Sequence, residues 1–304
     1  MRIVFLGTPE FTLPLLETCA GAGELVAVVA QPDRPVGRHA TVTPPPSKVW
    51  ASGRGIPVLQ PEKLKQGRLA QLLSELRPDV AVVAAYGRIL PADALAVPRY
   101  GCLNVHASLL PELRGAAPAQ WAVARQYTET GVTLMQMDEG LDTGDIRLQK
   151  RLAIAPDETG ESLLRKLAPL GAGALSEGLP RLDQLPRVPQ DHSRATLAPL
   201  LTREDGRADF SRSAFELDAR RRGFTPWPGE WTTLNGLVVK IHAAQPLRQA
   251  HGRAPGEVIS ALDVACGEET VWRLLEVQIE GKKRLAAGPF LAGLRANAPQ
   301  RLGT

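Results

Sequence analysis

The sequence predicts an α/β protein: a Rossmann-like open, mostly parallel sheet, followed by a smaller domain of short strands. Over roughly the first 190 residues, short continuous apolar runs alternate with amphipathic segments, a pattern typical of β-α-β units. In the last third, short strand-like runs are separated by Gly and Pro turns, which indicates a small β-barrel. The length of 304 residues exceeds that of one typical domain.

The first β-α-β unit begins at the N-terminus. Arg2 to Leu6 reads as a buried strand, and Gly7-Thr8-Pro9 as a turn into a helix that ends at Gly21-Ala22-Gly23. Leu25 to Ala30 is the next strand. The turn lacks a Gly-x-Gly-x-x-Gly motif, so this architecture does not imply a dinucleotide cofactor.

The alternation continues after a proline-rich segment, Gln31 to Pro46, which we expect to be a long loop without regular structure. Its basic residues are compatible with a functional loop or with a solvated one. We expect two helices here, over 47–54 and 69–76. We also expect two strands, over 57–59 and 80–84.

Polar side chains concentrate where two later strands end. Asn104 and His106 close the apolar run from Cys102, and the turn 140–145 follows the apolar run from Val132 to Met137. If these strands pair, the Asp-containing turn lies beside the histidine. Asn, His and Asp together suit attack on a carbonyl: an amide donor for the oxyanion, an imidazole, and a carboxylate that favours the charged ring.

Nucleophilic catalysis is not indicated. Ser108 lacks a Gly-x-Ser-x-Gly elbow, and Cys102 lies in an apolar strand, where thiols usually pack. Direct transfer without an acyl-enzyme is therefore expected. A purely structural polar strand end is the alternative to catalysis.

The rest of the chain leads into the second domain. We expect an edge strand over 146–154, a helix from Thr159 that ends or kinks at Pro169, and a proline-rich linker over 179–199. A helix from Asp209 to the Arg220–Arg222 run and short strands near 238–241, 256–259 and 271–277 follow.

Composition favours a reducing, cytoplasmic setting. The three cysteines are far apart and lack metal-site or disulfide spacing, and no window is long and apolar enough for a membrane span. Net charge is +4: residues 1–189 hold 20 basic and 19 acidic residues (net +1), and the shorter remainder holds 16 and 13 (net +3). The second domain is thus the more basic one, which permits a polyanionic partner.

The motifs resemble those of the methionyl-tRNA formyltransferases and, more widely, of enzymes that transfer or remove the formyl group of 10-formyltetrahydrofolate. The matching residues run in family order and include 7–9, 31–35, 85–87, 89–91, 104–106, 108–111, 114–118, 140–145, 226–228 and 280–284. The resemblance covers nearly the whole chain.

The resemblance implies a catalytic domain over 1–189, a linker over 190–207 and an OB-like, tRNA-binding β-barrel domain over 208–304. It implies Asn104, His106 and Asp142 as the catalytic trio, with Asp145 as a neighbour. The implied folate-binding residues are Tyr86, Arg88, Ile89, Leu90, Ser108, Leu109, Leu110, Pro111 and Asp142. The implied tRNA contacts are Arg34, Arg38, Arg220, Arg221, Arg222, Lys282 and Lys283.

The expected activity is formyl transfer from 10-formyltetrahydrofolate to methionyl-initiator tRNA, without a metal, by a monomer that does not bind membranes. Other acceptors for the same chemistry are an amino-sugar nucleotide, glycinamide ribonucleotide or water. A non-catalytic RNA-binding protein with this fold is a rival of another class, which the intact trio disfavours.

Overall fold

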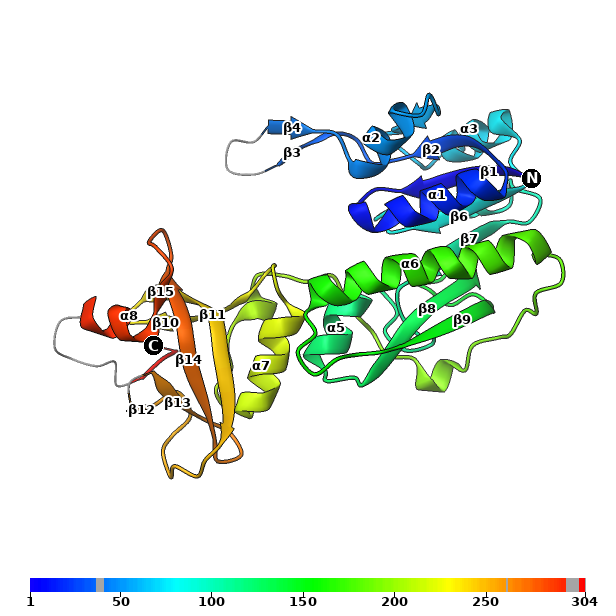
Figure 1. Cartoon of the computed structure of the whole chain (residues 1–304). Helices are drawn as coiled ribbons and strands as arrows, with labels where there is room; N and C mark the ends of the chain where they lie inside the picture. Colours follow the sequence, from blue (N-terminus) through cyan, green and yellow to red (C-terminus); the bar gives the residue numbers. More distant parts are fainter. Residues whose placement is uncertain (37–40, 261, 294–300, 304) are drawn as a thin grey trace. The chain divides into compact units, whose positions relative to one another are not determined.

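A computed structural model describes residues 1–36, 41–260, 262–293 and 301–303 (Figure 1). The chain forms two compact units, which we call the first and second units. The first comprises Met1–Pro118, Glu129–Ala153 and Leu164–Pro199, and the second comprises Ala119–Thr128, Ile154–Leu163 and Leu200–Thr304. The predicted linker 190–207 is thus divided between them, and the second unit includes two stretches that precede it in the chain.

The first unit contains a seven-stranded sheet in the order β5-β2-β1-β6-β7-β8-β9. Its strands are β1 (Arg2–Gly7), β2 (Glu24–Val29), β5 (Val58–Leu59), β6 (Val80–Ala84), β7 (Cys102–His106), β8 (Glu129–Gln136) and β9 (Ile146–Ala153). The five strands from β5 to β7 pair in parallel, whereas β8 and β9 are antiparallel to their neighbours. The expected Rossmann-like, mostly parallel sheet and the pairing of β7 with β8 are confirmed.

Helices cover both faces of this sheet (Figure 1). They are α1 (Leu13–Ala22), α2 (Pro46–Ser52), α3 (Arg68–Leu76), α4 (Ala92–Leu95) and α6 (Gly160–Gly178), which begins in the second unit. On one face, Leu69 and Leu73 of α3 share a core with Val4 and Leu6 of β1. On the other, α6 packs so closely on β7 that a Cβ at Gly171 would lie 2.9 Å from Val105 Cγ1.

Of the two outcomes expected at Pro169, an end of the helix is wrong, and the expectation that the segment from Gln31 lacks regular structure is also wrong. Helix α6 continues through Pro169 to Gly178; the proline is exposed, so the carbonyl group it frees can turn to water. The segment from Gln31 is not devoid of structure, because β3 (Arg34–Val36) and β4 (Thr41–Thr43) form a short antiparallel hairpin. Residues 37–40 between these strands lie outside the described residues.

The second unit is built on antiparallel strands in the order β10-β11-β14-β13-β12, with β15 also paired to β14. The strands are β10 (Glu230–Leu234), β11 (Leu237–Arg248), β12 (Val258–Ser260), β13 (Asp263–Cys266), β14 (Thr270–Ile279) and β15 (Leu285–Ala286), with helices α5 (Pro118–Ala124), α7 (Ala214–Gly223) and α8 (Ala287–Gly293). Near the C-terminus, the Leu302 amide donates to Gly256 O, and the Gly303 amide to Thr233 O. These bonds connect the β12 side of the sheet to β10, as a barrel requires.

Each unit has its own apolar core, and the core of the second contains the fully buried Trp272. All three cysteines, Cys19, Cys102 and Cys266, are free and buried. Burial raises the pKa of each thiol, to about 12 for Cys102 and Cys266. Among the described helices, none is long and apolar enough to cross a membrane.

Candidate active site

The candidate site lies where β7 ends. Because strand side chains alternate between faces, Asn104 and His106, two residues apart, share one face of the sheet. Strand β6 pairs with β7 through Val83 and Asn104, and β8 pairs with it through Thr133 and His106. The chain segments that follow β6 and β7 therefore leave the sheet at the same edge.

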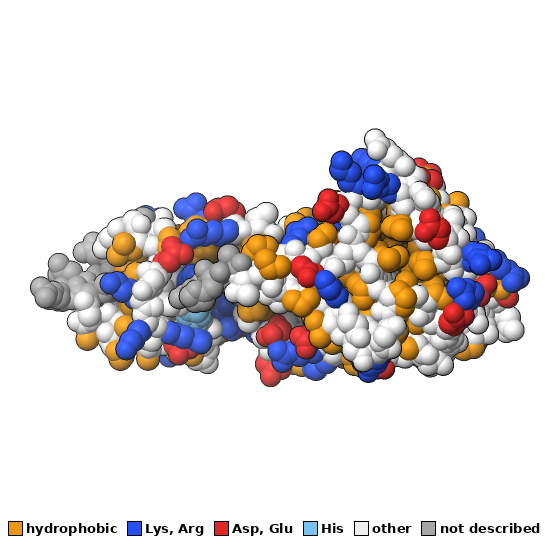
Figure 2. Space-filling model, turned by 90° about the horizontal axis from the view of Figure 1, so that it is seen from above, with side chains coloured by type: hydrophobic (Ala, Val, Ile, Leu, Met, Phe, Trp, Pro, Cys, Tyr) orange, Lys and Arg blue, Asp and Glu red, His pale blue; other side chains and the backbone are white. Residues whose placement is uncertain are grey.

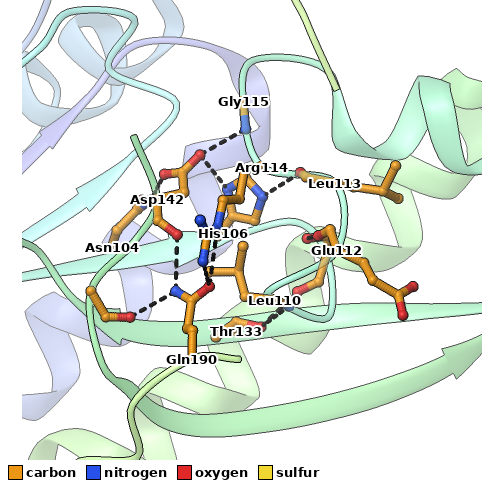
Figure 3. Close-up of polar contacts among 12 residues, drawn as sticks. Asn104, His106, Leu110, Glu112, Leu113, Arg114, Gly115, Thr133, Asp142 and Gln190 are labelled. Atoms are coloured by element: carbon orange, nitrogen blue, oxygen red, sulfur yellow. Dashed lines mark hydrogen bonds and ion pairs between the residues drawn. The ribbon is translucent and has the colours of Figure 1, made fainter. Parts of the chain in front are cut away.

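His106 is buried and held in one orientation (Figure 3). Its Nε2 lies 2.9 Å from Leu113 O. A carbonyl oxygen can only accept, so Nε2 carries the hydrogen of this bond. The other ring nitrogen, Nδ1, lies 3.6 Å from Asp142 Oδ2. Thus Nδ1 is the ring nitrogen that faces the carboxylate of Asp142.

An unusual backbone conformation and two hydrogen-bond donors position the carboxylate of Asp142. Its φ is +51°, a left-handed value that Asp adopts more readily than most residues. The Gly115 amide donates to Oδ2 at 2.8 Å, and Asn104 Nδ2 donates to Oδ1 at 3.3 Å. The structure therefore brings Asn104, His106 and Asp142 together, as expected from the strand pairing.

The turn that carries Asp142 has little freedom. A Cβ at Gly144 would stand 1.8 Å from Gln136 O, so only glycine fits there. Asp145 contributes its main-chain oxygen, which accepts from the Gln136 amide at 2.8 Å. The distinction between Asp142 at the histidine and Asp145 as a neighbour agrees with this geometry.

Two further side chains could in principle act as nucleophiles, Ser108 and Cys102, but neither is activated. Ser108 is fully buried, and its hydroxyl donates to Glu112 O at 2.6 Å. The Cys102 thiol, with its pKa near 12, is protonated at neutral pH. Within the described residues, no group of three or more His, Cys, Asp and Glu side chains is arranged to hold a metal ion.

The predicted folate residues after β6 differ in exposure. Tyr86 is 2% exposed, and its main-chain oxygen accepts from Gln31 Nε2 at 2.8 Å. Arg88 donates to the main-chain oxygens of residues 61 and 62. Ile89 is 83% exposed, whereas Leu90 is buried. Ile89 is thus the apolar side chain of this segment that is free to contact a ligand.

The predicted folate residues after β7 form a tight loop that is hydrogen-bonded to Thr133. Thr133 Oγ1 donates to Ser108 O and accepts from the Leu110 amide, at 2.7 and 3.0 Å. Leu110 is buried, while Leu109 and Pro111 are partly exposed. This loop joins His106 to Leu113, so Thr133 also stabilises the position of the histidine's acceptor.

The predicted tRNA contacts of the first unit lie on the β3–β4 hairpin. Arg34 is exposed, and its Nη2 donates to Gln31 Oε1 at 2.8 Å. Arg38 lies outside the described residues.

In the second unit, the Arg220–Arg222 run of α7 is largely engaged within the protein. Arg221 and Arg222 form ion pairs of 2.7 and 3.0 Å with Asp218, and their side chains are 16% and 18% exposed. Arg220 donates to Asp205 O and lies over the Phe224 ring. Phosphate contacts by this run would compete with these partners.

Lys282 and Lys283, by contrast, are both exposed. The adjacent Arg284 pairs with Glu276 at 2.6 Å. On the face shown in Figure 2, basic and acidic side chains are interspersed. Because Lys282 and Lys283 are exposed and Arg220–Arg222 bind partners within the protein, the two lysines are the more accessible of the predicted second-unit cations.

Sequence reasoning missed two buried polar residues at this site, Gln190 and the side chain of Arg114. They are 5% and 7% exposed and bond to each other beside Asp142 (Figure 3). Arg114 was noted only within a motif, and Gln190 lies in a run without periodicity. No local pattern indicates that residues 76 positions apart meet.

Comparisons with known proteins show which families and individual proteins the chain resembles. The formyl transferase family model matches residues 1–179, and the model of the formyl transferase C-terminal domain matches residues 200–295. The methionyl-tRNA formyltransferase of Myxococcus xanthus (strain DK1622) is 53% identical over 298 residues, covering 96% of this chain and 95% of that protein. The enzyme of that name from Anaeromyxobacter sp. (strain K) is 51% identical, and the match covers both chains completely.

A solved structure shares the fold at low sequence identity. The N-formyltransferase from Helicobacter canadensis, in complex with folinic acid and dTDP-3-aminofucose, superposes with a TM-score of 0.66. It is 17% identical, and the match covers 90% of this chain and 98% of that one. From the family models and the full-length relatives together, the chain belongs to the formyl transferase family and, within it, to the methionyl-tRNA formyltransferases.

Proposed function

We propose that this protein transfers a formyl group from 10-formyltetrahydrofolate to the amino group of methionyl-initiator tRNA. The observation that carries the proposal is the convergence of Asn104, His106 and Asp142 at the end of β7, in a chain that matches methionyl-tRNA formyltransferases over its full length.

The chemistry follows from where the donors point. The methionyl amine attacks the formyl carbon, and the carbonyl oxygen becomes an oxyanion that needs hydrogen-bond donors. Asn104 Nδ2 and His106 Nδ1, when protonated, supply two such donors, because Nε2 is already committed to Leu113 O. The negative charge of Asp142, 3.6 Å from Nδ1, attracts the positive charge of the ring.

Collapse of the tetrahedral intermediate breaks the bond between the formyl carbon and N10 of the folate. The amine loses a proton and N10 gains one, so the reaction needs a proton path rather than an oxidant or a metal. Asp142, the carboxylate beside His106, would assist removal of the amine's proton through a water molecule.

We assign the folate to the segments that follow β6 and β7. Main-chain amides and carbonyls in this region suit the donor and acceptor edge of a pterin, and the exposed Ile89 with Leu109 offers apolar contact. Tyr86, Arg88, Leu90, Ser108, Leu110 and Pro111 hold the shape of these segments.

For tRNA, we assign phosphate contacts to Lys282 and Lys283 of the second unit and to Arg34 of the hairpin, since these cations are exposed. Arg220–Arg222 would join them only by exchanging their present partners. We further propose that the protein acts as a monomer, with the chemistry confined to the first domain.

The test is a formyl-transfer assay with purified protein, 10-formyltetrahydrofolate and methionyl-initiator tRNA. The expected product is formylmethionyl-tRNA, formed many times faster than formate is released without tRNA. Formate release that does not depend on tRNA would instead identify a hydrolase. Transfer to an amino-sugar nucleotide or to glycinamide ribonucleotide, but not to tRNA, would identify another acceptor.

A further inference from the structure

The three-residue segment Leu113–Gly115 touches both partners of the His106–Asp142 pair (Figure 3). At one end, Leu113 O accepts from His106 Nε2 at 2.9 Å. At the other, the Gly115 amide donates to Asp142 Oδ2 at 2.8 Å. The separation of imidazole and carboxylate is therefore set by where this segment lies.

Arg114, in the middle of the segment, is anchored on both its main chain and its side chain. Its amide donates to Thr196 O at 2.8 Å, and its carbonyl accepts from the Ala198 amide at 2.7 Å. Its buried guanidinium donates to Gln190 Oε1 from Nη2 at 2.6 Å and from Nε at 3.2 Å. The segment 190–198 thus holds Arg114 from two sides.

Gln190 also hydrogen-bonds to the turn that carries Asp142. Its Nε2 donates to Asp142 O at 2.9 Å and to Gly144 O at 2.7 Å. The buried carbamoyl group therefore uses its oxygen on Arg114 and both hydrogens on the turn, which fits a glutamine and no charged residue.

From these contacts we infer that Arg114 and Gln190 are positioning residues, which fix the distance between the His106 imidazole and the Asp142 carboxylate. The inference rests on the proposed function, because it assigns a catalytic use to that distance. The side chains act through the main chain of residues 113–115 and of the Asp142 turn. They hold the pair in register and do not touch the reacting atoms.

The decisive variant is Gln190→Glu. A carboxylate still accepts from Arg114, and more strongly, so the anchor of the segment is kept. It has no hydrogens for Asp142 O and Gly144 O, and its charge repels both oxygens. We expect kcat to fall by about 100-fold, since displacements near 1 Å can cost this much. KM for tRNA and the dissociation constant of the folate should stay within about twofold of the wild type, because the group acts through orientation.

Gln184→Glu is the matched control, because it makes the same charge change at an exposed position six residues before Gln190. It should retain wild-type kcat. If Gln190→Glu does not fold, Arg114→Lys is the second variant. It keeps the charge but cannot make both guanidinium bonds, and we expect a drop in kcat of about 10-fold with the same split between kcat and KM.

The NMR signals of the His106 ring, identified by their loss in His106→Gln, provide a readout without turnover. They should shift in Gln190→Glu and not in Gln184→Glu. A Gln190→Glu enzyme with kcat within twofold of the wild type, or with unshifted His106 signals, would overturn the inference. A wild-type protein inactive on methionyl-tRNA would refute the proposed function while leaving the NMR test of positioning intact.

Discussion

Glu230, at the start of β10, carries a carboxyl group that is almost completely out of water. The residue is 1% exposed, and neither carboxyl oxygen has a hydrogen-bond partner among the described residues. Burial raises the pKa of Glu230 to about 8, although Arg220, Arg221 and Arg212 act in the opposite direction. At neutral pH this side chain is therefore mainly neutral in the folded protein.

The consequence is a stability that falls as the pH rises. Between the ordinary carboxyl pKa of 4.5 and the folded pKa of about 8, the unfolded chain has released the proton and the folded chain still holds it. The free energy of unfolding then decreases with pH. The full difference is roughly 5 kcal/mol, at about 1.4 kcal/mol for each pKa unit. Below pH 4.5 the effect is absent, and above pH 8 it is complete.

Glu230→Gln removes the titration and keeps the shape of the side chain. We expect the variant to gain stability relative to the wild type by roughly 3 kcal/mol between pH 4.5 and pH 7, and by roughly 5 kcal/mol between pH 4.5 and pH 9. Urea unfolding followed by tryptophan fluorescence suits the measurement, because four of the five tryptophans belong to the second unit.

Glu268→Gln, at an exposed position of the same unit, is the control and should show little change of this kind with pH. If the stability difference between Glu230→Gln and the wild type were the same at pH 5 and pH 9, Glu230 would be ionised in the folded state. Burial would then not raise the pKa of Glu230 in the folded protein.

Three further predictions concern catalysis and tRNA. His106→Ala should lower kcat by orders of magnitude with folate affinity nearly unchanged, because the ring acts in the transition state; steady-state kinetics and folate titration test this, and activity within about tenfold of the wild type would contradict the role. Asp142→Asn should be comparably damaging and Asp145→Asn milder in the same assay, and the reverse order would reassign the carboxylate. Lys282→Ala with Lys283→Ala should raise KM for tRNA and flatten its salt dependence, while turnover at saturating tRNA persists; an unchanged KM and salt slope would place both lysines on a solvated face.

The arrangement of the first unit followed from local sequence signals. Apolar runs gave the strands, and the pairing of the run ending in His106 with the one preceding the Asp142 turn was enough to bring the site together. Such runs are informative because a strand buried on both faces tolerates few polar residues. The mostly parallel sheet and the convergence of Asn104, His106 and the Asp142 turn could therefore be predicted.

Contacts that depend on residues far apart in the sequence, or on very short strands, could not be predicted in this way. Arg220–Arg222 read as an open cationic run, but Asp218, three and four residues before Arg221 and Arg222, binds two of them on the same helix. The β3–β4 hairpin escaped notice because its strands have three residues each. Gln190 meets Arg114 only after the chain has folded back on itself.

Because its three cysteines are free and buried, we expect the native protein to react very little with thiol reagents. Since the thiolate is the reactive form, side chains with pKa values raised by burial should ignore maleimides and iodoacetamide while the fold is closed. A cysteine introduced at an exposed position would then take a fluorophore alone, with no need to remove the natural ones. Conversely, labelling of the natural cysteines would report opening of the first unit at Cys19 and Cys102 and of the second at Cys266.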